Sequence, residues 1–190
     1  MRLVVTEFIA LDGVMEDPGG AEGSPGGGWA FRFERGPEGD KFKVDELMAA
    51  DALLLGRKTY EGFAKARQSI TDDQGFAARM NSMPKYVVSS TLQDPEWQNT
   101  TVLSGNVVEE VSRLKEQPGA DLLVAGSARL VHTLVEHHLV DEYRLVVYPI
   151  VLGRGKRLFP ENAKPTPLTF VETKPSAQVV LLRLQPPAEA

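Results

Sequence analysis

The chain has 190 residues, of which 42% are hydrophobic and 25% charged, as is typical of one compact globular domain. Its formal net charge of −5 argues against a general nucleic-acid-binding protein, because phosphate neutralisation supplies most of the affinity of such proteins. Cysteine is absent, which excludes disulfides, thiolate metal sites and cysteine nucleophiles.

The first element in chain order is an apolar run that only Glu7 interrupts. This run is too short for the core of a signal peptide, and no later apolar run reaches the roughly 18 residues of a membrane span. We therefore expect a buried first strand and a cytoplasmic protein that does not contact a membrane. This run at 3–10 and similar short runs, bounded by turn residues, predict strands at 3–10, 52–55, 86–88, 101–103, 122–125 and 143–151.

Segments with helical spacing of apolar residues lie between these strands. They predict helices around 42–48, over 59–66, around 107–114 and over 130–139. Strands that alternate with helices indicate a largely parallel sheet covered by helices. After 143–151 the pattern changes to consecutive strands at 168–172 and 178–184, which predicts an antiparallel hairpin turning at 174–176. Residues 1–185 are thus expected to form a single domain, followed by a frayed tail at 186–190.

The segment from Asp17 to Trp29 carries six glycines and two prolines. It is either a flexible surface loop or a mobile lid whose Trp29 covers a ligand. It is not a phosphate-binding P-loop, because no Gly-Lys-Ser/Thr sequence follows it.

Three strand ends carry residues suited to phosphate. At Ala125-Gly126-Ser127-Ala128-Arg129 a strand passes through small residues into a helix, whose first N–H groups can hold an anion or whose Ser127 can simply cap it. At Gly56 a strand again meets a helix, with Arg57 and Thr59 beside it. The third strand is followed by Ser89, Ser90 and Thr91.

Taken in chain order, the motifs at Gly56, at Ser89-Ser90 and at Gly126 resemble the cofactor motifs of dihydrofolate reductases. Residues 139–143 and 149–155 resemble still more the C-terminal reductase domain of the bacterial riboflavin-biosynthesis deaminase–reductase, and Leu11-Asp12-Gly13-Val14 fits that group too. The resemblance implies a dihydrofolate reductase-like, three-layer α/β/α fold with a mostly parallel mixed sheet. It also implies NADPH as cofactor, a small heterocyclic substrate and a homodimer.

The resemblance also implies roles for particular residues. Arg57, Ser89 and Ser90 would lie near the adenosine ribose and its 2′-phosphate, and Ala10, Asp12 and Val14 near the nicotinamide. Gly56, Thr59, Ala125, Gly126, Ser127, Ala128 and Arg129 would line the diphosphate, and Trp29, Leu152 and Gly153 would contact the substrate.

The catalytic residue is expected to be Asp40. It aligns with the substrate-binding carboxylate of dihydrofolate reductases when counted back from Gly56, although capping of a helix start explains it equally well. Glu34 and Asp45 are weaker substitutes. The basic residues after Gly153 either form a cationic cluster near the substrate or simply face solvent.

The function expected from these residues is an NADPH-dependent reductase that transfers a hydride to a pteridine- or pyrimidine-like ring. The alternatives are a stand-alone 5-amino-6-(5-phosphoribosylamino)uracil reductase and a non-catalytic NADPH-binding protein. The stretch 144–148 lacks the Thr that dihydrofolate reductases carry, so folate is doubtful as the substrate. No metal is expected, because His132 and His137 are five residues apart and do not share a helix face.

Overall fold

The computed structural model describes residues 1–66, 75–161 and 163–187. The final residues of the tail predicted at 186–190 therefore lie outside the described part. None of the helices in the described part has the length and apolar character that crossing a membrane requires.

Eight strands form one mixed sheet in the order β4-β3-β2-β5-β1-β6-β8-β7. All adjacent pairs are parallel except β6–β8 and β8–β7, so β8 is the strand that runs against the others. The strands are β1 (Arg2–Ala10), β2 (Ala50–Gly56), β3 (Lys85–Val88), β4 (Thr100–Leu103), β5 (Asp121–Ala125), β6 (Glu142–Tyr148), β7 (Thr169–Ser176) and β8 (Val179–Gln185).

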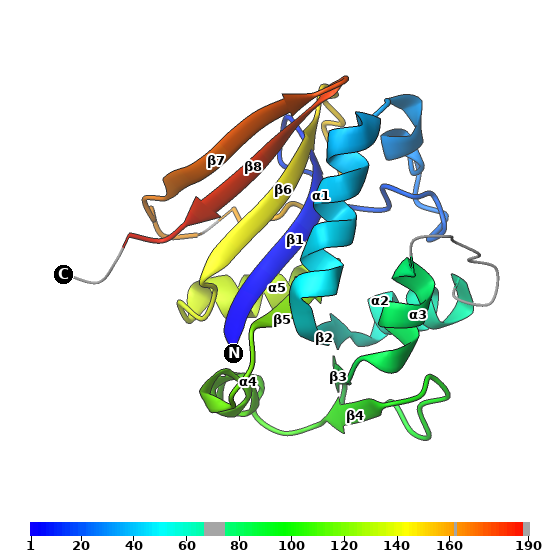
Figure 1. Cartoon of the computed structure of the whole chain (residues 1–190), viewed down its shortest axis with the longest axis vertical. Helices are drawn as coiled ribbons and strands as arrows, with labels where there is room; N and C mark the ends of the chain where they lie inside the picture. Colours follow the sequence, from blue (N-terminus) through cyan, green and yellow to red (C-terminus); the bar gives the residue numbers. More distant parts are fainter. Residues whose placement is uncertain (67–74, 162, 188–190) are drawn as a thin grey trace.

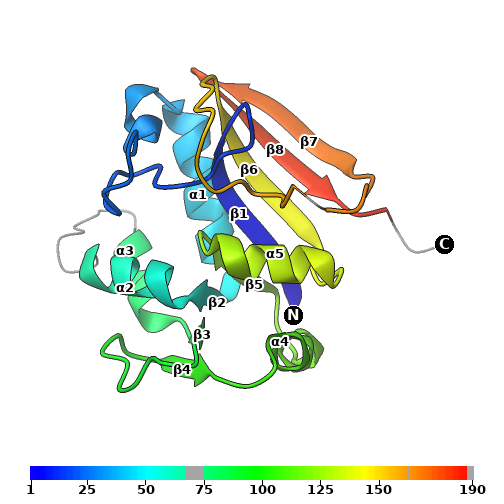
Figure 2. The same ribbon diagram turned by 180° about the vertical axis from the view of Figure 1, so that it is seen from behind.

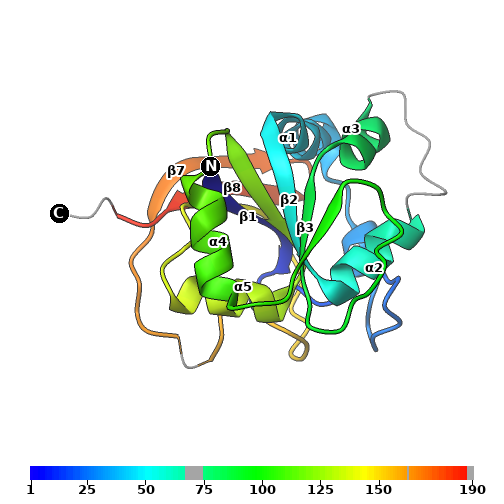
Figure 3. The same ribbon diagram turned by 90° about the horizontal axis from the view of Figure 1, so that it is seen from below.

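Helices cover both faces of the sheet, as Figures 1 and 2 show from opposite sides. The described helices are η1 (Trp29–Arg32), α1 (Gly36–Ala49), α2 (Arg57–Ala66), α3 (Phe76–Ser82), α4 (Val107–Glu116) and α5 (Ala128–Glu136). Leu53 and Leu55 of β2 pack in one core cluster with α1, α2 and α3, whereas Leu54 packs with α4 and α5. Figure 3 shows α1 and α3 on one side of the sheet and α4 and α5 on the other, so the predicted α/β/α layering is confirmed.

Two local predictions were wrong. The hairpin does not turn at residues 174–176, because these belong to β7, and the turn is Ala177–Gln178 with Ala177 at a φ of 47°. The strand predicted to reach residue 151 ends at Tyr148, where Pro149 cannot donate to a ladder.

The topology fixes where a ligand can bind. The parallel strands β2, β5 and β1 are neighbours, so their carboxyl ends meet at one edge of the sheet. Beyond Thr6–Ala125 the strands β1 and β5 no longer pair, whereas β1 continues alongside β6 to Ala10. The sheet therefore opens between β1 and β5 at the edge where α/β proteins bind their ligands.

Candidate functional site

A cavity of about 1590 Å³ lies at this opening. Single small-molecule sites have roughly 300–1,000 Å³, so the cavity has room for a dinucleotide and a second ligand. It is lined by the carboxyl ends of β1, β2 and β5, by the cavity-facing side of α1 and by the starts of α2 and α5.

The residues predicted to hold the diphosphate come together at one end of this cavity. Ser127 Oγ accepts the N–H of Gly56 at 2.8 Å, and Thr59 Oγ1 accepts the N–H of Ser127 at 3.0 Å. Gly126 has a φ of +59°, and a Cβ at that position would lie 2.9 Å from the Thr59 side chain. The starts of α2 and α5 are thus locked side by side. The residues of this group that line the cavity are Gly56, Arg57, Thr59, Ala125, Gly126, Ser127, Ala128 and Arg129.

Ser127 does not cap α5 through its side chain, which corrects the capping alternative. Its hydroxyl is turned toward β2 and β5, where it accepts from Gly56 and donates to the carbonyl oxygen of Ala125. Because this hydroxyl does not cap α5, the first N–H groups of the helix are available to an anion.

Arg57 reaches the loop that follows β3. Its Nη1 donates to Thr91 Oγ1 at 2.6 Å, and its Nε pairs with Glu61 at 2.7 Å. Ser89 and Ser90 lie in this loop but do not line the cavity. The Ser89 hydroxyl accepts from the N–H groups of Thr91 and Leu92, so it stabilises its own turn.

The residues predicted beside the nicotinamide form a packed double loop. Asp12 accepts the N–H of Gly153 at 2.7 Å and that of Leu152 at 3.4 Å, while Val14 pairs with Arg157 in an isolated bridge. These N–H bonds hold the pKa of Asp12 below its usual value, although burial opposes the shift. Ala10, Asp12, Val14, Leu152 and Gly153 are thus brought together, but outside the cavity lining.

Trp29 is a core residue and not a lid. It is 1% exposed, its ring packs edge-on against Tyr148 with centroids 5.3 Å apart, and its indole N–H donates to the Glu16 carbonyl. The Gly-rich segment is also held in place, because the buried Asp17 carboxylate accepts the N–H groups of Glu22 and Ser24. The basic residues Lys156 and Arg157 pair with Glu16 and Asp12.

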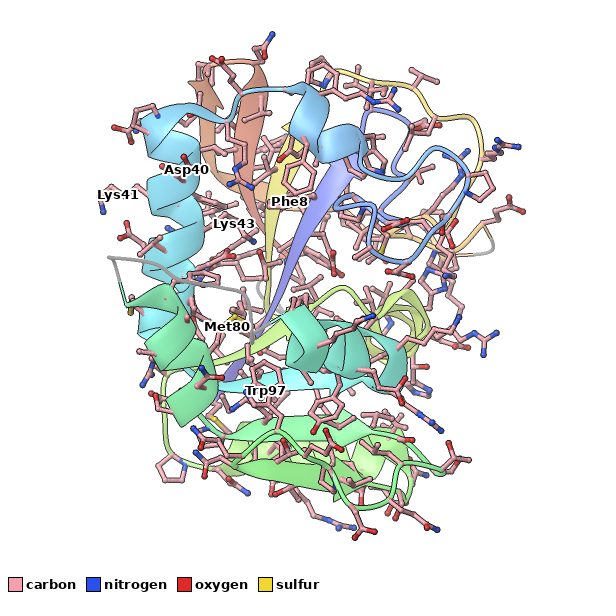
Figure 4. All side chains as sticks on the ribbon, turned by 90° about the vertical axis from the view of Figure 1, so that its right-hand side faces the viewer. Phe8, Asp40, Lys41, Lys43, Met80 and Trp97 are labelled. Carbon is pink, nitrogen blue, oxygen red and sulfur yellow. The ribbon has the colours of Figure 1, made fainter. Side chains whose placement is uncertain are left out.

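Asp40 lines the cavity, but its side chain is 60% exposed and pairs with Arg35 at 2.7 Å. Helix α1 begins at Gly36, so Asp40 lies inside the helix and the alternative of a helix cap is wrong. Figure 4 shows Asp40 on the first half of α1, with Lys43 farther along the helix and pointing toward the sheet.

A second polar group lies deeper in the cavity, and the sequence analysis assigned it no role. It consists of Thr6 and Glu7 on β1 and Lys43 and Glu46 on α1, here called the Glu7 cluster. The signal that could have found it is the acidic residue within the otherwise apolar first strand.

Comparisons with known proteins agree with this geometry. The RibD C-terminal domain profile matches residues 2–182. The chain is 30% identical over 176 residues to the uncharacterized protein YyaP of Bacillus subtilis (strain 168), covering 91% of this chain and 88% of YyaP. It is 29% identical to the uncharacterized protein YwjB of the same strain, covering 95% of each.

Two solved structures share the fold. A putative riboflavin biosynthesis protein from Shewanella sp. PV-4 superposes with a TM-score of 0.74 at 20% identity, covering 99% of this chain and all of that one. Dihydrofolate reductase from Enterococcus faecalis, complexed with NADP(H) and RAB-propyl, superposes with a TM-score of 0.62 at 16% identity, covering 98% of this chain and 97% of that one. With the profile match over nearly its whole length, the chain belongs to the RibD C-terminal domain family.

Proposed function

We propose that this chain is an NADPH-dependent reductase that transfers a hydride to a pteridine- or pyrimidine-like ring. The observation that carries the proposal is the cationic end of the cavity, where the starts of α2 and α5 meet and Arg57, Lys58 and Arg129 line the wall. Helix starts and cations favour an anionic ligand, and Gly126, where a Cβ would meet Thr59, lets the two helix starts approach each other.

The residues present fit NADPH. Thr59 and the first N–H groups of α2 and α5 would hold the diphosphate, over a turn that Gly56, Gly126 and Ser127 shape, and Arg57 would pair with the 2′-phosphate through its guanidinium. When bound, NADPH would supply the hydride. The remaining cavity, between β1 and α1, is lined by the rings of Phe8 and Phe33 and suits a flat heterocycle.

The substrate end favours a ring without a phosphate group. Four cations line the cavity away from the two helix starts, and each already has an acidic partner: Arg35 with Asp40, Lys41 with Asp45, Lys43 with Glu46, and Lys156 with Glu16. A phosphoribosylated pyrimidine would need one of these pairs to open, as a 2′-phosphate would open Arg57–Glu61, and it stays the second candidate substrate after an unphosphorylated pterin or pyrimidine.

Two measurements test the proposal. NADPH should raise the melting temperature, because a ligand that binds the native state stabilises it. At a hundred times its Kd, the free energy of unfolding should increase by about 2.7 kcal/mol. NADPH oxidation should then be followed with dihydrofolate, other pterins and 5-amino-6-(5-phosphoribosylamino)uracil. Binding without oxidation of NADPH by any substrate would favour a non-catalytic binding protein, and absence of binding would overturn the proposal.

A further inference from the structure

Within the Glu7 cluster, Thr6, Lys43 and Glu46 join β1 to α1 through a continuous set of polar contacts, whereas Glu7 interacts with Lys43 and Glu46 through charge. Lys43 Nζ pairs with Glu46 Oε1 and donates to Thr6 Oγ1 at 2.5 Å, and Thr6 Oγ1 in turn donates to Glu46 Oε1 at 2.7 Å. The N–H of Gly126 donates to the Glu7 carboxylate. Figure 4 shows Lys43 pointing from α1 toward the sheet, whereas Lys41 points away from it.

Two oxygens of this cluster have no hydrogen-bond partner among the residues that the structure describes. They are Glu7 Oε1 and Glu46 Oε2, on residues that are 6% and 4% exposed. Buried polar atoms are almost always hydrogen-bonded, because an unmade bond costs free energy. Both residues line the cavity. The two oxygens are therefore placed to receive a ligand.

The surroundings of Glu7 favour its protonated form. Burial raises the pKa of Glu7 well above its usual value, and the charge of Glu46 raises it further, whereas Lys43 and the Gly126 N–H lower it. Lys43 forms an ion pair with Glu46, and its positive charge acts on Glu7 from a distance. Glu7 is therefore the carboxyl of this cluster that is suited to donate a proton, and the unpartnered Glu46 Oε2 is an oxygen that can accept an N–H.

We propose that Glu7 and Glu46, and not Asp40, bind the substrate, which is a flat heterocycle presenting an N–H beside a carbonyl or ring nitrogen. This inference rests on the proposed reductase function and assigns its substrate end. The Glu46 carboxylate accepts the substrate N–H, and the Glu7 carboxyl donates to the neighbouring acceptor. Phe8 also lines the cavity, with the Arg35 and Lys43 cations 5.1 and 5.0 Å from its ring centroid.

Glu7 is also the proton source for the reduction. Reducing a ring C=N bond adds a hydride to carbon and a proton to nitrogen, and the double bond becomes CH–NH. Bound NADPH would supply the hydride, while Glu7 gives the proton and becomes a carboxylate that water reprotonates. Asp40 is poorly placed for this step, because its exposed carboxylate is already paired with Arg35.

The protonation of Glu7 can be measured without substrate or cofactor. In protein labelled with ¹³C-glutamate, the carboxyl resonance missing from Glu7→Gln identifies Glu7. We expect it to titrate well above the ordinary glutamate value of about 4.3. Titration together with the exposed glutamates would overturn the proposal.

Ligand recognition is tested with lumazine, which carries N–H groups beside carbonyls, against 1,3-dimethyllumazine, which lacks those N–H groups. Wild-type protein at pH 6.5 should bind lumazine at least about tenfold more tightly, as expected for a hydrogen bond to a charged group. Glu46→Leu should abolish the preference, and Glu7→Gln, an isostere of the neutral acid, should keep it. Equal binding of the two probes by wild type, or an unchanged preference in Glu46→Leu, would overturn the proposal.

Turnover provides the last readout. For a heterocycle that wild type reduces, Glu7→Gln should lower kcat by about 10²- to 10⁴-fold with little change in KM, because it binds but carries no acidic proton. Glu136→Gln, an exposed change on α5, is the control and should leave both unchanged. Loss of kcat in Asp40→Asn but not in Glu7→Gln would assign the proton to α1 and overturn the inference. If NADPH does not raise the melting temperature, only the reductase proposal is overturned. The titration and lumazine binding still test the roles of Glu7 and Glu46, because neither measurement depends on cofactor.

Discussion

Arg57 is the residue on which the cofactor preference depends. Its guanidinium stands between Glu61 and Thr91, where the ribose end of a bound NADPH would lie. A charged hydrogen bond of this kind is worth about 1.5–3 kcal/mol, so Arg57→Ala should weaken NADPH by roughly 10- to 150-fold. NADH, which lacks the 2′-phosphate, should lose much less. Isothermal titration with both cofactors measures the two losses.

Arg113→Ala is a matched control for this change. Arg113 also pairs with a glutamate four residues away, but on the exposed face of α4 and outside the cavity lining. It should leave both affinities unchanged. Equal weakening of NADPH and NADH by Arg57→Ala would contradict the assignment of Arg57 to the 2′-phosphate.

Gly126 is a position where the backbone conformation and the packing both require glycine. Its φ is +59°, and an added Cβ would meet Thr59 at 2.9 Å. Gly126→Ala should therefore lower the free energy of unfolding by about 1–3 kcal/mol, measured by urea denaturation. Gly62→Ala in α2 has open space around it and should raise stability by about 0.5–1 kcal/mol. If both variants were equally stable, the turn would not be strained.

At the residue scale, the sequence predicted which residues gather at the starts of α2 and α5, but it did not point to the Glu7 cluster. The motifs around Gly56, Arg57 and Gly126 could be read locally, because each follows a strand whose end the topology fixes. Lys43 and Glu46 look like ordinary polar helix residues, and only tertiary packing against β1 buries them beside Glu7. Asp40 was selected by counting along the chain, which does not reveal that Arg35 pairs with it.

At the scale of elements, the amino-terminal ends of β1, β5 and β6 and the carboxyl end of β8 form an ion-pair network. This network lies at the opposite end of the strands from the cavity. Glu142 of β6 is fully buried and accepts from Arg2, Arg144, Arg183 and Gln185. Burial opposes ionisation, but the hydrogen bonds from Arg183, Arg144 and Gln185 prevail and lower the pKa of Glu142 to about 2.

This pKa predicts a pH dependence of stability. The folded state binds the Glu142 proton less readily than the unfolded state, so its contribution is complete above pH 4.5 and is lost as the pH falls toward 2. Glu142→Gln should remove on the order of 3 kcal/mol at pH 7 and flatten the slope of unfolding free energy between pH 4.5 and 2. Glu172→Gln, at an exposed partner of the same Arg183, is the control and should change neither by more than about 0.5 kcal/mol. An unaltered slope in Glu142→Gln would contradict the assignment.

Element prediction succeeded where apolar periodicity was strong and failed where it was weak. Strands β1 and β5 and helix α4 were visible because their apolar residues follow the period of the element. Helix α3 was missed, since none of its seven residues is buried and no apolar stripe marks it. The end of β7 was missed because Pro175 reads as a turn, although an edge strand tolerates a proline.

For the whole molecule, the order of strands and motifs was sufficient to predict the layers and the place of the cavity. The parallel sheet gathers its strand ends at one edge, so three motifs far apart in sequence were expected to meet there, and those after β2 and β5 do. The depth of the substrate end depends on how α1 lies across β1, which no local pattern encodes.

The last prediction concerns assembly. Strand β7 is a sheet edge that carries Glu172, Lys174 and Pro175, residues that oppose pairing with another strand, while its first half also exposes Phe170 and Val171 at 65% and 47%. We propose that two copies pair along this first half. Light scattering coupled to size exclusion should give the mass of a dimer, and Phe170→Glu should give a monomer, whereas Thr173→Glu should stay dimeric. A wild-type chain that is still monomeric at about 100 μM would refute the pairing. An interface that is used for assembly has a dissociation constant below that concentration.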